Sequence, residues 1–323
     1  IRVNMPMVYY HVWDNYPYPK FNRRFYRSTD EVVCISKVTY DIVQTTAPAV
    51  SSHYHPHAVN SEVFKKLTSA EQLEAIKSCR EKIINVSKGV AQNPNKKIFI
   101  WNNRNARRKQ SGTIIWWFKE WLAKVGHDKA ALVMHTDAQD PHGQDLPHII
   151  EELKATDGQV LLSTNKVSPE ELAIMYNAAD YTINISDAEG FGLGTLESLS
   201  CGTPIIVSMT GGMQEQVTNG KDWFGWGIQP VSKSVIGSLQ VPYIYEDRIS
   251  QEDFEKVMTK ALNLPKSKYK KLSEAGIQHV KDNFSFENYE KGWINMMDNF
   301  VEKHGSWENR KGYQSWKILE VAV

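Results

Sequence analysis

From about Pro94 onward, the chain alternates short runs of β-branched and aromatic residues with longer stretches of amphipathic helical period. This alternation is typical of a parallel sheet whose strands are joined by crossover helices. It predicts strands at 97–102, 131–135, 159–162, 181–186 and 204–208, and helices that include 113–125, 169–178 and 195–201. The pattern therefore restricts this region to one Rossmann-like α/β domain.

The residues before Pro94 carry only part of the same pattern. Strands are predicted only near 8–13, 31–36 and 52–55. The chain also begins at Ile1, without a methionine, as though an upstream portion were missing. We therefore expect an incomplete Rossmann-like domain over residues 1–92, a complete one over 93–300 and a tail over 301–323. Long helical patterns close the second domain at 252–262, 266–283 and 286–303.

Composition excludes several classes of protein. The 323 residues carry 38 basic and 37 acidic side chains, which is not the one-sided charge of a dedicated nucleic-acid binder. The three cysteines are not at metal-ligand or redox-motif spacing, so we expect reduced thiols and a cytoplasmic protein. No apolar run approaches the roughly 18 residues that a spanning helix needs. We expect a soluble chain, or one that meets a membrane only at its periphery.

The segment 186–197, SDAEGFGLGTLE, carries the most information about function. It follows a predicted strand and opens a helix, and ligands of an open α/β sheet bind at the carboxyl ends of the strands. Its glycines would let a phosphate approach the amides at the start of the helix. These glycines are Gly190, Gly192 and Gly194. Glu189 and Glu197 bracket them, and carboxylates repel phosphate but accept hydrogen bonds from sugar hydroxyls. The alternative is that Glu189 only caps the helix and Glu197 is only a solvated helix residue. The glycine spacing favours a site for a nucleotide-sugar instead.

A second loop leads to the same edge of the predicted sheet. The strand at 97–102 is followed by a basic turn that contains Arg104 and Lys109. Cations at the carboxyl end of a parallel strand are well placed to neutralise a pyrophosphate leaving group. A solvated basic turn is the alternative. One predicted loop carries glycines and carboxylates and the other carries cations, and both lie at the same edge of the sheet. This combination favours a functional site over a solvated turn.

Glu189 and Glu197 form an E-x7-E motif, and Arg104 is followed five residues later by Lys109. Further motifs are Gly190-Phe-Gly-Leu193, Cys201-Gly-Thr-Pro204 and Gly211-Gly-Met-Gln-Glu215. With these motifs, residues 5–284 resemble the retaining GT-B glycosyltransferases of family four, relatives of glycogen and sucrose synthases. The resemblance implies two Rossmann-like domains that face a cleft. The N-terminal, acceptor-side domain would be incomplete here, and the C-terminal one would bind the donor.

The resemblance also implies a role for each candidate residue. Glu189 would bind the transferred sugar and Glu197 the ribose. Arg104 and Lys109 would contact the diphosphate. His11 resembles the family's sugar-contacting histidine, although a packed histidine at a strand end is an equally good interpretation. The remaining donor-binding residues would be Gly190, Phe191, Gly192, Leu193, Gly194 and Thr195.

These inferences predict an enzyme that uses no metal or cofactor and transfers a sugar, with retention, from a UDP- or GDP-linked donor. Neither glutamate is left free to act as a nucleophile, so we favour transfer on one face of the sugar over double displacement. The acceptor classes left open are a glycan, a lipid and a small molecule. A catalytically silent nucleotide-sugar-binding subunit and a nucleotide-sugar epimerase on the same fold are the alternatives.

Two other features have simpler structural interpretations. His53, His55 and His57 alternate as metal ligands on one strand face would, but Pro56 interrupts the strand, so we expect a turn. The basic-aromatic stretch 20–27 could touch a phospholipid or a charged acceptor. A solvated helix edge is the simpler interpretation of that stretch.

The final segment, from Gly305 to Val323, contains several large aromatic residues. In the fold that the resemblance implies, C-terminal helices cross back to the N-terminal domain. We therefore expect this segment to pack on the first domain through Trp307, Tyr313 and Trp316.

Overall fold

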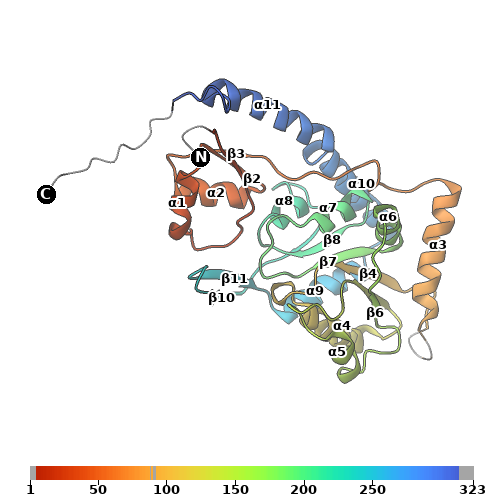
Figure 1. The fold of residues 1–323 in the computed structure, drawn as a ribbon. Helices are drawn as coiled ribbons and strands as arrows, with labels where there is room; N and C mark the ends of the chain where they lie inside the picture. Colours follow the sequence, from red (N-terminus) through yellow and green to blue (C-terminus); the bar gives the residue numbers. More distant parts are fainter. Residues whose placement is uncertain (1–4, 88, 90–91, 313–323) are drawn as a thin grey trace, which may run out of the picture.

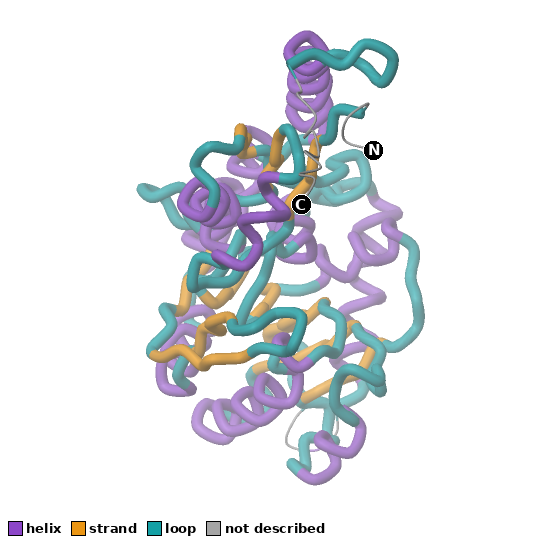
Figure 2. The backbone as a smooth tube through the Cα atoms, turned by 60° about the vertical axis from the view of Figure 1, so that its left-hand side comes forward, coloured by secondary structure: helices purple, strands orange, loops and turns teal. Residues whose placement is uncertain are grey.

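The computed structural model describes residues 5–87, 89 and 92–312 and contains two parallel sheets with helices around them (Figure 1). The strands of the first sheet are β1 (Val8–His11), β2 (Glu31–Cys34) and β3 (Ser51–Tyr54), in the order β1-β2-β3. The second sheet has six strands. Figure 2 shows the strands of the two sheets as an upper and a lower group.

The six-stranded sheet has the order β6-β5-β4-β7-β8-β9. Its strands are β4 (Lys97–Asn102), β5 (Ala130–His135), β6 (Val160–Ser163), β7 (Tyr181–Asn184), β8 (Ile205–Ser208) and β9 (Gly225–Ile228). This is the Rossmann order, which reverses its direction between the first strand and the fourth. The reversal lies between β4 and β7, which pair in parallel. The predicted Rossmann-like region is confirmed, with β9 as an additional strand.

Helices cover both sheets (Figure 1). Around the first sheet lie η1 (Lys20–Asn22), α1 (Arg23–Arg27) and α2 (Lys37–Thr46). The others are α3 (Ala70–Asn85), η3 (Arg107–Lys109), α4 (Ser111–Val125), α5 (Leu146–Glu152), α6 (Pro169–Ala178), α7 (Leu193–Ser200), α8 (Met213–Val217), α9 (Gln251–Leu262), α10 (Lys266–Asn283) and α11 (Phe286–His304). None of the helices in the described chain is both long and apolar enough to span a bilayer.

Local sequence explains where these elements begin and how they pack. α6 begins with a capping box, in which Ser168 and Glu171 each accept a hydrogen bond from the other's backbone amide, and Pro169 occupies the first turn. Residues 98–101 of β4 are each at most 1% exposed, because helices cover both faces of a parallel sheet. Alternate side chains enter different clusters: Phe99 packs with Phe118 on one face and Ile100 with Tyr176 on the other.

An antiparallel hairpin, β10 (Ser232–Ile236) and β11 (Ile244–Arg248), reaches from the second sheet to the first (Figure 1). The amide of Tyr245 donates to the carbonyl of Tyr16, and the side chain of Asn15 donates to the carbonyl of Tyr245 at 3.1 Å. The hairpin thus joins the loop after β1 to the second sheet. The sequence pattern did not predict it.

The chain crosses between the sheets twice, and the two crossings touch. The first follows β3 and includes Val59, and the second joins α10 to α11 at Phe284 and Ser285. The amide of Val59 donates to the carbonyl of Phe284 at 3.1 Å, and Val59 forms a parallel bridge with Ser285. α11 then runs back beside the first sheet (Figure 1).

Charged side chains hold the end of α11 to the first sheet. Lys303 and His304 reach the carboxylate of Glu31 at 2.9 and 3.3 Å. Arg310 forms a two-pronged ion pair with Asp30 at 2.6 and 3.2 Å. The end of α11 and Arg310 therefore lie against the first sheet.

Of the three aromatic anchors predicted for this segment, the structure tests one, and that prediction is wrong. The side chain of Trp307 is 64% exposed, so it does not anchor the segment. Tyr313 and Trp316 lie outside the described residues. Within the described residues 305–312, the side-chain contact to the first sheet is the ion pair between Arg310 and Asp30.

Candidate active site

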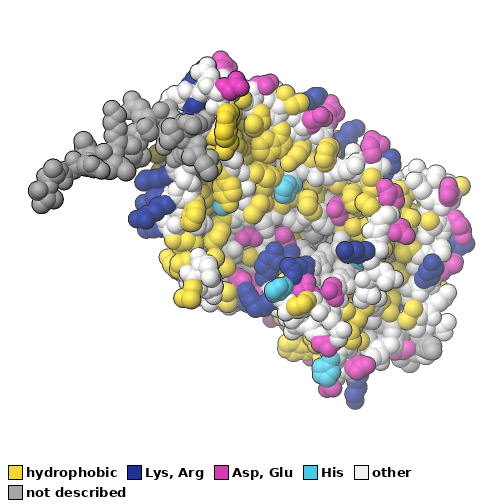
Figure 3. Space-filling model, viewed as in Figure 1, with side chains coloured by type: hydrophobic (Ala, Val, Ile, Leu, Met, Phe, Trp, Pro, Cys, Tyr) yellow, Lys and Arg dark blue, Asp and Glu magenta, His cyan; other side chains and the backbone are white. Residues whose placement is uncertain are grey.

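The loops that carry the predicted site meet at the reversal point of the six-stranded sheet. One loop follows β4 and contains η3, and the other follows β7 and leads into α7. β4 and β7 are neighbours, so their carboxyl ends open at the same edge. Figure 3 shows basic side chains gathered near the centre of the face that Figure 1 presents.

Lys109 and Glu189 form an ion pair between these two loops. The two residues are 6% and 9% exposed, so the pair is buried. Burial and the neighbouring Arg108 lower the pKa of Lys109 to about 7, whereas Asp14 acts in the opposite direction. The structure thus brings together the lysine predicted for the diphosphate and the carboxylate predicted for the sugar.

Glu197 lies in α7, in a chain of hydrogen bonds that begins at the end of β4. The side-chain amide of Asn102 donates to the Tyr176 hydroxyl at 2.7 Å, and that hydroxyl donates to Glu197 at 2.9 Å. Burial raises the pKa of Glu197 to about 7, and the Tyr176 hydroxyl partly offsets the shift. These two hydrogen bonds fix the orientation of the Glu197 carboxylate.

The glycine-rich loop is shaped for close approach of the backbone. Gly192 has a φ of +91°, which other residues rarely adopt, and it precedes the first residue of α7. A Cβ on Gly194 would lie 3.2 Å from the Asn102 carbonyl and from the Tyr176 hydroxyl. The amides of the first turn of α7 have no intrahelical acceptor, and they form the positive end of the helix dipole. An anion is the natural ligand there.

The three other predicted donor-binding residues, Phe191, Leu193 and Thr195, differ from one another in burial and in their contacts. Phe191 is buried at 3% exposure, whereas Leu193 is 47% exposed. The hydroxyl of Thr195 lies 2.7 Å from the Gly192 carbonyl and 2.6 Å from Gln216 Oε1, so it braces the loop from within. Gln216 was not predicted, although it stands one residue after the Gly211–Glu215 motif.

Arg104 forms its ion pair with Asp140 rather than with Glu189. Its side chain is 61% exposed, and its guanidinium donates to Asp140 at 2.7 and 3.1 Å. This contact lowers the pKa of Asp140 to about 2. Its proposed contact with the diphosphate stays a prediction.

His11 lies at the end of β1, within the first sheet. It is 3% exposed, and its Nε2 lies 2.8 Å from the Tyr26 hydroxyl. Burial lowers its pKa to about 4, so the ring is neutral at pH 7. It lines a hollow of about 470 Å³ together with Tyr9, Trp13 and Phe25. These contacts support a packed histidine, and its role as a sugar ligand stays a prediction.

Sequence reasoning missed a charge network that the hairpin brings to the site. Arg107 binds Glu246 of β11 with two bonds of 2.8 and 2.6 Å, and Glu246 is 1% exposed. Arg248 pairs with Asp187, two residues before Glu189. The adjacent charged residues Glu246, Asp247 and Arg248 were the sequence signal for it.

Asp14 was also missed. It follows β1, so the rule that ligands bind at the carboxyl ends of parallel strands applied to it as well. Burial raises its pKa to about 6, and Arg108 and Lys109 oppose the shift. These electrostatic interactions place Asp14 beside the two cations, on the side of the first sheet.

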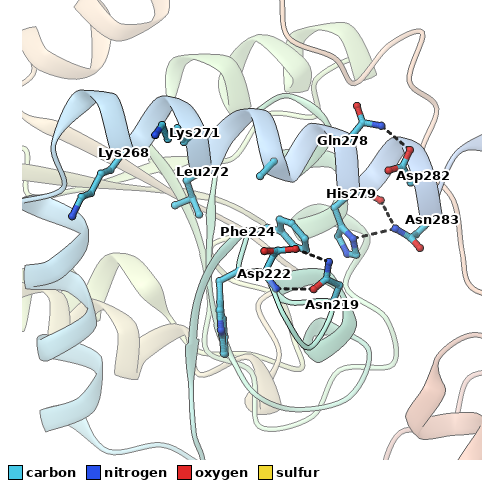
Figure 4. Close-up of a pocket in the computed structure, with 12 residues that line it drawn as sticks. Asn219, Asp222, Phe224, Lys268, Lys271, Leu272, Gln278, His279, Asp282 and Asn283 are labelled. Carbon is cyan, nitrogen blue, oxygen red and sulfur yellow. Dashed lines mark hydrogen bonds between the residues drawn. The ribbon is translucent and has the colours of Figure 1, made fainter.

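A hollow of about 540 Å³ lies elsewhere, against α10 (Figure 4). His279 stacks on Phe224 there, with ring centroids 4.1 Å apart. None of the predicted site residues lines it. Nor do three or more His, Cys, Asp or Glu side chains of the described chain form a group that could hold a metal ion.

Comparison with solved structures supports the GT-B fold. A sucrose-phosphate synthase from Thermosynechococcus elongatus aligns with a TM-score of 0.66 at 18% identity over 87% of this chain and 61% of its own. The Anabaena protein HepE, solved with UDP and glucose, aligns with a TM-score of 0.68 at 16% identity over 91% of this chain and 72% of its own. The two Rossmann-like units correspond to that fold.

Sequence comparisons agree. The chain is 28% identical over 184 residues to an alpha-monoglucosyldiacylglycerol synthase from Streptococcus pneumoniae, covering 57% of this chain and 38% of the relative. It is 28% identical over 155 residues to a probable sucrose-phosphate synthase from Thermosipho melanesiensis, covering 46% and 30%. The chain thus matches about a third of each relative's length. Residues 84–279 match the family model "Glycosyl transferases group 1". The chain therefore belongs to the group 1 glycosyl transferases.

Proposed function

We propose that the chain transfers a sugar from a nucleotide diphosphate-sugar, linked to UDP or GDP, to an acceptor. We further propose that the transfer retains the anomeric configuration and uses no metal ion. The observation that carries the proposal is the buried Lys109–Glu189 pair beside the first turn of α7, at the reversal point of the sheet. A cation, an acceptor of hydroxyl hydrogen bonds and a row of backbone amides converge there.

The donor would lie across the start of α7. Its diphosphate would accept hydrogen bonds from the amides of that turn and from Lys109. Glu189 would accept from hydroxyls of the transferred sugar, and Glu197, held by Tyr176, would accept from the ribose. This arrangement requires the donor to replace the contact between Lys109 and Glu189 with two contacts of its own.

The proposed reaction takes place on one face of the sugar. The bond from the anomeric carbon to the leaving phosphate breaks, the bond to the acceptor oxygen forms on the same face, and the acceptor proton passes to the phosphate. Negative charge then grows on the leaving diphosphate. A diphosphate beside Lys109 raises its pKa from about 7, so the lysine is charged when the leaving group needs it.

The acceptor classes are a glycan, a lipid or a small molecule. Relatives named for a glucosyldiacylglycerol and for sucrose phosphate support the lipid and small-molecule classes. All three cysteines are free in the structure, which supports a cytoplasmic location. The proposal includes no nucleic-acid partner.

The experiment begins with calorimetry of the chain and UDP or GDP, with and without EDTA. Binding of one nucleotide that EDTA does not change is the expected result. Binding that EDTA abolishes and Mg²⁺ restores would contradict metal independence.

Turnover is then measured with the matching nucleotide-sugar and a panel of acceptors, and the anomeric configuration of the product is read by NMR. Retention is expected. Donor binding without turnover would favour the silent subunit. Conversion of the donor to an epimer without any acceptor would favour the epimerase.

A further inference from the structure

The basic-aromatic stretch 20–27 forms one surface with the tip of the hairpin, and we call residues 20–29 and 231–243 together the docking surface. These two segments contain no acidic residue. Their basic residues are Lys20, Arg23, Arg24, Arg27 and Lys233. Figure 3 shows Lys and Arg side chains over α1 with hydrophobic side chains beside them. The two segments carry only positive charge, although the chain as a whole is nearly neutral, with a net charge of +1. Lys233 pairs with Asp247 of β11 at 4.0 Å, so the other four basic residues provide the net positive charge of the surface.

Large apolar side chains project from the same surface. Phe25 is 67% exposed, Val235 69% and Leu239 98%. The two segments are side by side, because the rings of Phe21 and Tyr243 lie 6.5 Å apart. Single exposed apolar residues are common, but exposed apolar tips combined with basic side chains are typical of surfaces that enter a lipid headgroup layer.

A hollow opens in the docking surface. It has about 470 Å³, and Trp13, Phe25 and Tyr26 line it together with Gln240 from the hairpin. Trp and Tyr prefer the boundary between lipid headgroups and acyl chains, where an apolar ring and a polar edge are both satisfied. The hollow thus adds an aromatic-lined recess to a basic surface with apolar tips.

We propose that the docking surface seats this protein on a bilayer that contains anionic phospholipids. Phe25 and Leu239 enter the boundary of the acyl chains, while Lys20 and Arg24 meet lipid phosphates. Charge complementarity selects the anionic lipid, and the exposed apolar tips select a bilayer over a soluble polyanion, which offers them no apolar phase. The proposal goes beyond the proposed transferase function and does not depend on it.

The test is flotation of the full chain with vesicles of phosphatidylcholine, with and without phosphatidylglycerol. We expect binding only to the vesicles with phosphatidylglycerol, and weaker binding as salt is raised. The variant Lys20→Gln/Arg24→Gln loses about fivefold in affinity for each cation removed. The variant Phe25→Ser/Leu239→Ser also loses vesicle binding, because its apolar tips no longer enter the bilayer.

The matched control changes one exposed apolar residue and one exposed lysine of α3, which lies on the opposite side of the molecule from α1 (Figure 1). The control variant, Leu73→Ser/Lys82→Gln, should float as the original chain does. Thermal melting confirms that each variant is folded. Nucleotide calorimetry on the same variants tests the proposed function separately, since none of these residues lies in the Lys109–Glu189 site.

Three results would overturn the proposal. The first is absence of binding to vesicles with phosphatidylglycerol, and the second is equal binding to phosphatidylcholine alone. The third is binding to a soluble polyanion such as heparin that matches the vesicle affinity and does not change in Phe25→Ser/Leu239→Ser. That outcome would identify the surface as a polyanion site with no role for the apolar tips.

Discussion

At the residue scale, Lys109 and Glu189 satisfy each other at the place where the proposed donor would need both. A buried charge that loses its partner is destabilising, so removal of either side chain would leave the other one buried and unpaired. Conservative substitutions are therefore the informative ones. Replacement of a glutamate by glutamine keeps the size of the side chain and an oxygen that accepts hydrogen bonds.

We predict different kinetic effects for the two glutamates. Glu189→Gln removes charge beside the reacting sugar, where positive charge develops, so it should mainly lower kcat. Glu197→Gln weakens the hold on the ribose, which changes little during the reaction, so it should mainly raise KM for the donor. A loss of about 1–3 kcal/mol in transition-state binding fits each substitution. Initial rates at saturating acceptor measure both effects, and the reverse pattern would exchange the assigned roles.

We predict that Glu197 makes stability depend on pH. Its pKa is raised to about 7 in the folded chain from an ordinary 4.5, so it stabilises the fold below about pH 4.5 and loses that contribution as pH rises to 7. Glu197→Gln does not titrate and keeps an acceptor for Tyr176. The free energy of unfolding of the variant, taken relative to that of the original chain, should therefore rise by about 1–3 kcal/mol from about pH 5 to about pH 8. Urea unfolding at the two pH values measures this, and a constant difference would contradict it.

At the scale of elements, the glycine at the start of the Gly211–Glu215 motif supports the loop that carries Glu189. Gly211 has a φ of +50°, and a Cβ there would overlap the carbonyl oxygen of Glu189. The amide of Gly212 donates to that same carbonyl at 3.2 Å. Two loops of the sheet edge are thus in direct backbone contact.

We predict that Gly211→Ala displaces Glu189 and abolishes most nucleotide binding. Gly220→Ala is the matched control, because Gly220 also has a positive φ, +92°, but nothing lies within 4 Å of its added Cβ. The control should show only the backbone strain, about 1 kcal/mol, with unchanged affinity. Calorimetry and thermal melting of both variants separate the two effects. Equal affinities would show that the loop contact does not position Glu189.

The sequence predicts elements better than it predicts side-chain directions. The strands of the second sheet were predictable because residues such as those at 98–101 are buried on both faces and form apolar runs. The hairpin was not, because β10 is largely exposed and carries no alternation of apolar and polar residues. The position of Lys109 follows from its place after a strand. The direction of Arg104 does not, because Asp140, its partner, is 36 residues away in the sequence.

At the scale of the whole molecule, Glu31 joins the first sheet to the end of α11. Burial opposes ionisation of Glu31, but hydrogen bonds from Lys303, His53 and His304 outweigh it and lower the pKa. The ionised carboxylate therefore stabilises the fold above its ordinary pKa of 4.5, and that contribution disappears as pH falls through the lowered folded-state value.

We predict that Glu31→Gln lowers stability by about 1–2 kcal/mol at neutral pH and makes acid unfolding less steep. Glu62→Gln is the control, since the Glu62 side chain is 88% exposed and its pair with Lys65 is a surface one. Thermal melting from neutral to acid pH compares the two variants. Identical curves would show that α11 is held by other contacts.

The adjacent crossings at Val59 and Phe284 have a mechanical consequence. Both covalent links between the two sheets pass through one hydrogen-bonded point, so a rotation of one sheet relative to the other has its pivot there. The ring of Phe191 packs edge-on against His57, next to the first crossing, and against Phe284 in the second, at centroid distances of 5.4 and 5.7 Å. Phe191 stands two residues after Glu189. A rotation of one half relative to the other is thereby transmitted through Phe191 to the loop proposed to bind the donor.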